Sequence, residues 1–112
     1  MSPRDKADRF VQVQTTLDSR DRAAELVREV LDARLAACGQ IVGPVESAYW
    51  WGGAVETAVE WLCLFKTRAE LGERLERFLA ERHPYEVPEI VVLPIERASE
   101  AYGDWIDRET RG

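Results

Sequence analysis

Residues 82–90, RHPYEVPEI, hold the side chains of this sequence that are best suited to chemistry. They include the chain's only histidine, His83, followed by the phenol of Tyr85 and the carboxylate of Glu89. An imidazole nitrogen can bind a transition metal, and a phenol beside a carboxylate can orient a small polar ligand. A structural alternative is that the segment ends a helix, because Pro84 disfavours a helical conformation at His83. His83 would then satisfy a terminal carbonyl or pair with a carboxylate.

The rest of the sequence offers few partners for a metal ion or for a nucleophile. Cys38 and Cys63 lie in separate apolar runs, and neither belongs to a CxxC pair, so buried reduced thiols are expected. No P-loop, dinucleotide fingerprint, nucleophile elbow or HExxH motif occurs. A lone histidine without such a motif is weak support for a catalytic triad. The sequence therefore predicts that the protein is not an enzyme.

The composition indicates one acidic globular domain. The chain has 112 residues, 46% of them hydrophobic, and no linker or repeat divides residues 1–112. Its 21 Asp and Glu residues outnumber its 15 Lys and Arg residues, and the net charge of -6 repels nucleic acid and anionic membranes. The N-terminal residues lack an apolar stretch, and no apolar run approaches the roughly 20 residues of a membrane span. We expect a soluble, cytoplasmic protein that binds neither nucleic acid nor membrane.

Hydrophobic periodicity predicts a strand and then a helix in the first part of the chain. Residues 10–17, FVQVQTTL, alternate with the period of two that is typical of a half-buried strand. Asp18 or Ser19 can cap the helix that follows, in which apolar residues recur every three or four positions. We expect this helix to close near Cys38, with Gly39 as its stop signal.

The next part of the chain predicts a long β-hairpin. Two runs rich in aliphatic and aromatic residues flank Gly52-Gly53, a dipeptide that tolerates the positive φ angles of a two-residue turn. Gly43-Pro44 should kink or bulge the incoming arm, because proline cannot donate to the ladder. Each arm exceeds the usual five or six residues, so the hairpin should extend past a small sheet. Exposed edges with large aromatics favour packing between subunits over an aromatic box for a ligand, and the expected interface residues are Tyr49, Trp50 and Trp51.

A second helix and a third segment of strand complete the pattern. Thr67 and Glu70 have the spacing of a capping box, and helical periodicity then continues to about Arg82. Residues 90–93, IVVL, form an apolar run that predicts a central strand buried on both sides or under a helix. Ser99 opens a short last helix. The order β-α-β-β-α-β predicts an α+β, ferredoxin-like sandwich, an antiparallel sheet with helices on one face, plus a C-terminal helix.

Several of these segments together resemble the CutA family, proteins associated with divalent-cation tolerance. They are LAAC, the YWW cluster before its glycine turn, LFKT, HPYEVPEIVVLPI and YGDWI, and the resemblance spans about residues 10–108. It implies a single CutA-like domain that assembles as a homotrimer, with long hairpins pairing between chains. It further implies a PII-like architecture whose clefts between subunits are ligand sites.

The resemblance also implies a metal site. Copper binding in some relatives is attributed to a cysteine near the end of the first strand and to two adjacent histidines after the second helix. These positions read Thr15 and Arg82-His83 here, and a hydroxyl and a guanidinium are poor ligands for copper. His83 is thus the candidate ligand for copper or another divalent cation, with three imidazoles available if three copies meet on a threefold axis.

A second cluster on the family's pattern consists of Lys66, Tyr85 and Glu89. Sheet pairing could bring these side chains to one rim, where they would orient a small ligand or simply neutralise one another. Two hypotheses follow. The first is a CutA-like divalent-cation tolerance protein, a small trimer that responds to metal ions and binds copper or another divalent cation. The alternative is a PII-like signalling or scaffolding trimer that binds a small molecule in its clefts without metal.

Overall fold

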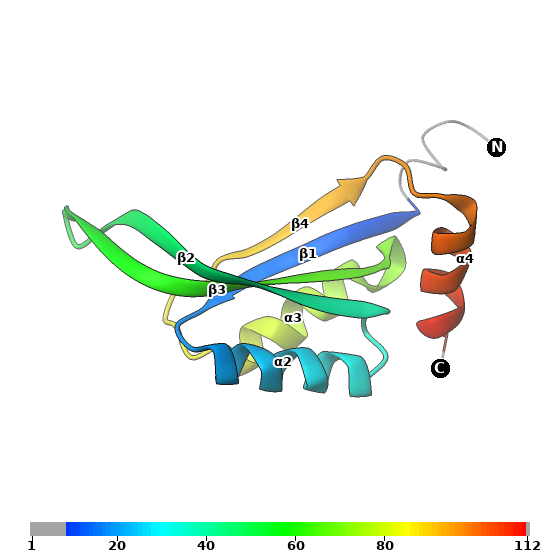
Figure 1. The fold of residues 1–112 in the computed structure, drawn as a ribbon, viewed down its shortest axis with the longest axis horizontal. Helices are drawn as coiled ribbons and strands as arrows, with labels where there is room; N and C mark the ends of the chain where they lie inside the picture. Colours follow the sequence, from blue (N-terminus) through cyan, green and yellow to red (C-terminus); the bar gives the residue numbers. More distant parts are fainter. Residues whose placement is uncertain (1–8, 112) are drawn as a thin grey trace.

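The computed structural model describes residues 9–111, and its helices and strands follow the predicted order (Figure 1). The elements are β1 (Phe10–Leu17), α2 (Arg20–Asp32), β2 (Cys38–Trp51), β3 (Ala54–Arg68), the 3-10 helix η1 (Ala69–Leu71), α3 (Gly72–Arg82), β4 (Ile90–Ile95) and α4 (Glu100–Glu109). Among the described residues, no helix has the length and apolar character needed to cross a membrane.

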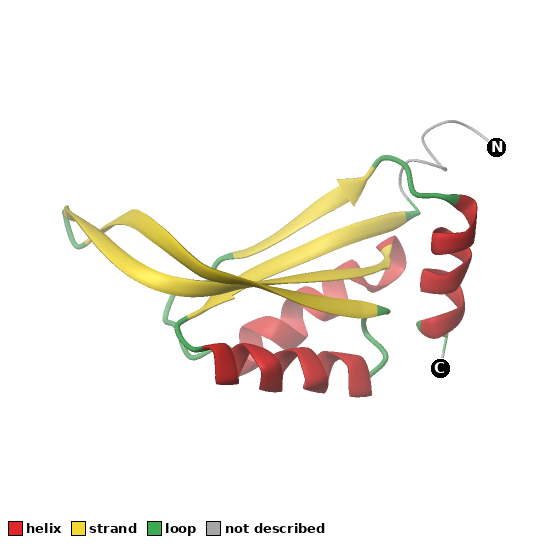
Figure 2. Ribbon diagram, in the orientation of Figure 1, coloured by secondary structure: helices red, strands yellow, loops and turns green. Residues whose placement is uncertain are grey.

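The four strands form one antiparallel sheet in the order β2-β3-β1-β4. This is the strand order of a ferredoxin-like sandwich, so the predicted α+β fold is confirmed. Helices α2 and α3 lie side by side against one face of the sheet, and α4 lies at the end of the sheet opposite the hairpin turn (Figures 1 and 2). The outer half of the hairpin extends beyond the other strands, because β1 pairs only with the second half of β3.

The hydrophobic core lies between the sheet and the two helices α2 and α3. Fully buried side chains come from β1, α2, β3 and α3: Val13, Leu17, Val30, Phe65, Leu75 and Leu79. Burying a side chain of this kind contributes about 1.5–3 kcal/mol. Helix α4 adds the fully buried Ile106, and Gly103 lets this helix approach Phe10, whose ring would lie 2.9 Å from a Cβ at that position.

Helix α2 begins as predicted and ends earlier than predicted. Ser19 is its N-cap, with its side-chain oxygen accepting a hydrogen bond from a backbone N–H of the first turn. The helix ends at Asp32, because Arg34 adopts a left-handed φ of 58° that closes the helix. The prediction of an end near Cys38 with Gly39 as the stop is therefore wrong. Both residues already belong to β2.

The β-hairpin of β2 and β3 confirms the predicted turn and the predicted irregularity. Gly52 and Gly53 have φ angles of 60° and 83°, as a tight two-residue turn requires. The register of the ladder shifts around Gly43-Pro44, where a bulge was expected. The turn lies at the far tip of the molecule, well away from the helices (Figure 1).

The predicted capping box at Thr67 is wrong. Thr67 belongs to β3, pairs in register with Val11 and is fully buried, so its side chain cannot cap a helix. The chain instead passes through η1, which has no side-chain cap, before α3 starts at Gly72. A β-branched residue suits a buried strand, and strand pairing prevails here over the local capping signal. The predicted end of the second helix at Arg82 is confirmed.

Residues 90–93 were predicted to form a central strand buried on both sides or under a helix. The central position is wrong for the single chain, whereas the packing under a helix is confirmed, because one face of β4 contacts α3. Strand β4 pairs only with β1 and lies at the edge of the sheet. Val91, Val92 and Leu93 are 36%, 37% and 42% exposed. An apolar run indicates that a strand is covered, but it does not say whether its own chain or another copy covers it.

Candidate functional site

The candidate site lies where β1 ends and the loop after α3 returns to the sheet. Helix α3 stops at Arg82 because the next residue, His83, precedes a proline and takes the extended angles φ -75° and ψ 135°. This turn carries His83 and Tyr85 towards Thr16 at the end of β1 and towards Glu60 in β3. Residues far apart in sequence thus meet at the end of β1.

Both ring nitrogens of His83 are engaged in hydrogen bonds. The backbone N–H of Tyr85 donates to Nδ1 over 3.1 Å, so Nδ1 carries no proton. Nε2 lies 2.8 Å from the carbonyl oxygen of Thr16 and therefore carries the proton that it donates. The rings of His83 and Tyr85 also pack edge to face at 4.6 Å. The imidazole is held neutral in a single tautomer, with no lone pair left for a metal ion.

Tyr85 and Glu60 form the second polar pair of the site. The phenol of Tyr85 donates a hydrogen bond of 2.9 Å to Oε2 of Glu60, whose residue is only 7% exposed. Burial, together with this carboxylate, raises the pKa of Tyr85 well above its usual value of 10.0. The phenol is therefore a hydrogen-bond donor at every physiological pH and fixes the orientation of the carboxylate.

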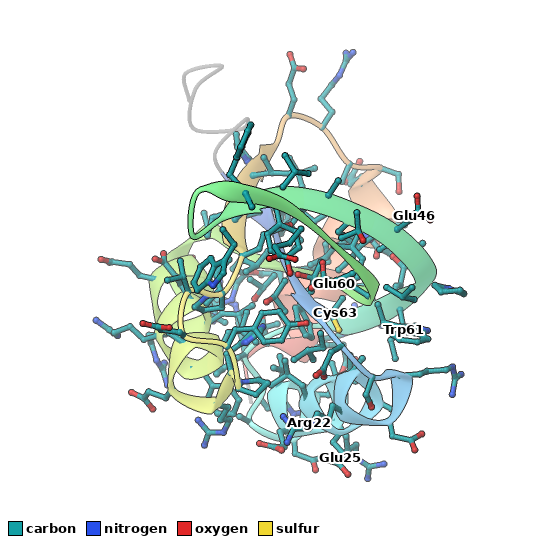
Figure 3. All side chains as sticks on the ribbon, turned by 90° about the vertical axis from the view of Figure 1, so that its left-hand side faces the viewer. Arg22, Glu25, Glu46, Glu60, Trp61 and Cys63 are labelled. Atoms are coloured by element: carbon teal, nitrogen blue, oxygen red, sulfur yellow. The ribbon has the colours of Figure 1, made fainter. Side chains whose placement is uncertain are left out.

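A groove of about 710 Å³ opens above this pair. Its lining comes from the end of β1, the outer arm of the hairpin and the loop before β4: Thr16, Ser47, Ala48, Tyr49, Trp50, Trp51, Glu60, Tyr85, Glu86, Val87, Pro88 and Glu89. Seen along the hairpin, Glu60 lies under the curve of its two strands (Figure 3). A volume of this size suits a small metabolite, and aromatic walls with a few polar groups are typical of ligand pockets.

A comparison with known protein families shows to which family the chain belongs. Its sequence matches the family described as CutA1 divalent ion tolerance protein over residues 11–109. The chain belongs to this CutA1 family. The resemblance inferred from the sequence motifs is thereby confirmed.

Individual CutA proteins show how far the similarity extends. Protein CutA 1, chloroplastic, of Oryza sativa is 36% identical over 101 residues, covering 90% of this chain and 57% of the relative. The chain thus spans little more than half the length of that plant protein. The divalent-cation tolerance protein CutA of Thermotoga maritima is 34% identical over 97 residues, covering 87% of this chain and 95% of the relative. These names describe tolerance and not a catalytic activity.

A solved CutA structure also matches the fold. It is the structure of CutA from Synechococcus elongatus complexed with a Bis-Tris molecule, with a TM-score of 0.85 and 33% sequence identity. The match covers 93% of this chain and 96% of that chain.

The three side chains that the CutA pattern grouped together do not all meet within one chain. Tyr85 and Glu89 both line the groove, and Glu89 accepts a hydrogen bond of 3.3 Å from the side chain of Gln14. Lys66 lies further along β3, where its ammonium donates to Gln40 over 2.7 Å. Lys66 is not part of the lining of this groove.

Glu60 is the groove residue that the sequence analysis missed. It belongs to an arm of alternating residues in which glutamates look like a solvated face. A weak signal was present, because Glu60 stands between Val59 and Trp61 just where the polar face of the arm becomes apolar. In the fold, the loop after α3 brings Tyr85 to this carboxylate, which is only 7% exposed.

The positions at which the resemblance implied copper ligands do not converge on a common point in this chain. Thr15 is fully buried, and its hydroxyl has no hydrogen-bond partner among the described residues. Arg82 donates a hydrogen bond of 3.1 Å to Glu29 and stacks on the ring of Phe78 at 3.6 Å. Within residues 9–111, no group of three or more His, Cys, Asp and Glu side chains is placed to hold a metal ion.

The two cysteines lie outside the groove. Cys63 is fully buried, as expected, and burial raises the pKa of its thiol to about 11. Cys38 is only partly buried, contrary to the expectation, and its sulfur lies 3.5 Å from the hydroxyl of Tyr102. Both are free thiols in the structure.

We expect Thr15→Val to raise the free energy of unfolding by about 1 kcal/mol. The substitution keeps the shape of the side chain and removes a buried hydroxyl without a partner, which is costly to bury. Chemical denaturation would measure the change. The matched control is Thr110→Val, which should destabilise the protein, since that hydroxyl accepts from Arg68 and donates to the carbonyl of Ile106. A destabilised Thr15→Val variant would contradict the prediction.

The pKa of His83 should lie below its ordinary value of 6.5, mainly because the ring is withdrawn from water. The carbonyl of Thr16 and the carboxylates of Asp18 and Glu60 act in the opposite direction without reversing the shift. Since this is the only histidine, one imidazole signal in a proton NMR titration reports it without ambiguity. A midpoint at or above 6.5 would contradict the assigned hydrogen bonds.

The same shift has a consequence for stability. The unfolded chain binds a proton more readily than the folded chain, so the stabilising contribution of neutral His83 is complete above pH 6.5. It is lost as the pH falls through the lower pKa of the folded state. The variant His83→Gln should lack this component of the pH dependence in denaturation measured between pH 5 and pH 7.5.

Proposed function

We propose that this protein serves divalent-cation tolerance as a homotrimer that binds a small ligand in its clefts, in the manner of a PII-like sensor. In this proposal His83 organises the cleft and does not hold a metal ion. The observation that carries the proposal is the groove of about 710 Å³ with the Tyr85 and Glu60 pair at its base. Membership of the CutA1 family supplies the connection with divalent cations.

The exposed apolar surface supports assembly of several copies. It consists of hairpin and β4 side chains that the single chain leaves exposed: Val42, Tyr49, Trp50, Trp51, Val55, Val59, Val91, Val92 and Leu93. Both edge strands, β2 and β4, have one side without a partner strand in this chain. Unpaired edges with apolar side chains favour pairing with another chain. Three copies are proposed because the CutA resemblance implies a trimer.

Two observations support a small ligand over a metal ion. The Synechococcus elongatus relative was solved in complex with Bis-Tris, a small organic molecule. In the present chain, the hydrogen bonds of His83 occupy both nitrogens that a metal would need. A metal at His83 would require the backbone N–H of Tyr85 or the carbonyl of Thr16 to lose its partner.

Calorimetric titration of copper and zinc into metal-free protein tests this proposal, with the mass measured by light scattering in the same buffer. We expect a mass three times that of the chain and weak metal binding that His83→Ala leaves unchanged. Tight binding at one ion per trimer that is lost in His83→Ala would overturn the proposal in favour of a threefold imidazole site. A monomeric mass would contradict the proposed assembly.

The connection with tolerance is tested in cells that lack their own copy of the gene. Restoring the protein should restore growth in excess copper or zinc, and His83→Gln, which preserves a donor and an acceptor, should restore it as well. The groove variant Trp50→Ala should restore growth less well. Full tolerance with Trp50→Ala and none with His83→Gln would place the function at the histidine and contradict the proposal.

A further inference from the structure

The groove is lined by acidic side chains without basic ones. Glu60, Glu86 and Glu89 contribute to its lining, and within residues 9–111 no lysine or arginine does. One oxygen of Glu89 accepts a hydrogen bond from the side-chain amide of Gln14, and this amide is neutral. A concave surface with one sign of charge attracts ligands of the opposite sign. Phosphates and carboxylates are therefore disfavoured in this groove.

Glu60 gives the groove a buried negative charge that lacks a counterion. The residue is 7% exposed, and among residues 9–111 no basic group lies within 4.0 Å of its carboxylate. Its Oε2 accepts the hydrogen bond of Tyr85, whereas Oε1 accepts none from the described residues. Oε1 is also not among the fully enclosed atoms without a partner, and Glu60 is one of the residues that line the groove. A nearly desolvated carboxylate is costly unless a cation pairs with it.

The wall beside Glu60 is aromatic. Tyr49, Trp50 and Trp51 line the groove from the end of β2, and Tyr85 lines it from the loop after α3. In the single chain the first three are 43%, 75% and 48% exposed, so their rings have surface available to a ligand in a cleft that another copy borders. Aromatic faces attract a cation through the ring quadrupole, most strongly when the cation is organic and weakly hydrated.

We propose that the groove binds a small organic cation, whose ammonium group pairs with Glu60 while its carbon atoms pack against the aromatic wall. A bare divalent metal fits less well, because it requires several converging ligands and the described residues offer no such group. The inference rests on the proposed function of the groove as a ligand cleft, and it adds the chemical class of the ligand.

A pair of isosteric probes tests the charge preference on the unaltered protein. Piperidinium and tetrahydropyran have nearly the same size and shape, but only piperidinium is charged at pH 7. Binding would be followed through the indole N–H signals of Trp50 and Trp51 in an NMR titration, in a phosphate buffer free of amines. We expect piperidinium to bind at least tenfold more tightly than tetrahydropyran. The affinity for piperidinium should fall as salt is added.

Variants then assign the preference to Glu60. We expect Glu60→Gln to lower the affinity for piperidinium at least tenfold and to change the affinity for tetrahydropyran by less than twofold. The control Glu56→Gln removes an exposed carboxylate of the same strand that is not in the lining, and it should change neither probe by more than twofold. If Glu60→Gln does not fold, the comparison of the two probes on the unaltered protein still decides the proposal.

The possible results separate this inference from the proposed function. Equal binding of the two probes at the groove would overturn the organic-cation assignment and leave the groove as a ligand cleft. A response to neither probe, nor to an anion of similar size such as cyclopentanecarboxylate, would overturn both proposals. Tighter binding of the anion would overturn the inference and point to a basic group from another copy in the cleft.

Discussion

Trp51→Glu should convert the assembled protein into single chains. Trp51 is 48% exposed in the isolated chain and lies at the end of β2, next to the turn of a hairpin that extends past the sheet. If copies cover this region, the substitution leaves a carboxylate without a counterion in each interface, at about 3 kcal/mol or more per copy. Three such sites exceed what an interface of this kind can tolerate. Sedimentation velocity should show the mass of one chain for the variant, whereas the proposed trimer predicts the mass of three chains for the unaltered protein.

Two variants control for a general effect of mutating the surface. Trp51→Phe keeps an apolar ring and should remain assembled. Arg77→Glu places a new carboxylate on the exposed surface of α3 and should also remain assembled. A Trp51→Glu variant that still sediments as a trimer, with its secondary structure intact, would show that the aromatic tip is not part of the interface.

The strands and the hairpin were predictable because the hydrophobic periodicity and the turn residues indicate the same structure. Residues 10–17 alternate with a period of two and form β1 with those bounds. The Gly52-Gly53 turn supplies positive φ angles just where the two apolar arms require them. Errors arose where a local signal competed with tertiary contacts. Gly39 has the composition of a helix stop, yet it is a strand residue packed so closely that a Cβ would lie 2.7 Å from Val27.

The edge position of β4 could not be predicted from its own residues. Its apolar run predicted burial, and in one chain those side chains are exposed. Periodicity reports that a strand will be covered, but the identity of the covering surface depends on the sheet order and on other copies. The exposure of Val91, Val92 and Leu93 is thus itself an argument for assembly. Their sequence predicts burial, and another copy of the chain would bury them.

The candidate site was predicted in part. The segment of residues 82–90 ends a helix and supplies His83 and Tyr85, as expected. The hydrogen bonds of His83 could not be predicted from the sequence, because its partners are a backbone N–H and the carbonyl of Thr16, which only the fold brings near it. Glu60 was missed because its burial comes from a loop distant in sequence. Lys66 was grouped with Tyr85 on the family's pattern, and the register of β3 separates them within one chain.

The second large effect is expected at Arg68, which attaches α4 to the sheet. Its side chain is 10% exposed and donates to the hydroxyl of Thr110 over 2.8 Å and to the carbonyl of Thr110 over 3.1 Å. It also lies 3.2 Å from Glu70 and 3.9 Å from Asp107. Arg68→Met should lower the free energy of unfolding by about 3 kcal/mol, because a buried carbonyl and hydroxyl lose their donor.

Arg108→Met is the matched control for this prediction. Arg108 lies in α4, the helix that Arg68 attaches to the sheet, and its side chain is 67% exposed. Its contact with Glu109 is 3.9 Å long, so the loss of this side chain should cost less than about 0.5 kcal/mol. Hydrogen exchange would show where Arg68→Met acts. Amides of α4 should exchange faster while those of β1 and α2 stay protected, because the core between the sheet and α2 does not include Arg68. Equal loss of protection throughout would mean that α4 and the sandwich unfold as one unit, and that Arg68 stabilises the whole domain and not the attachment of its last helix.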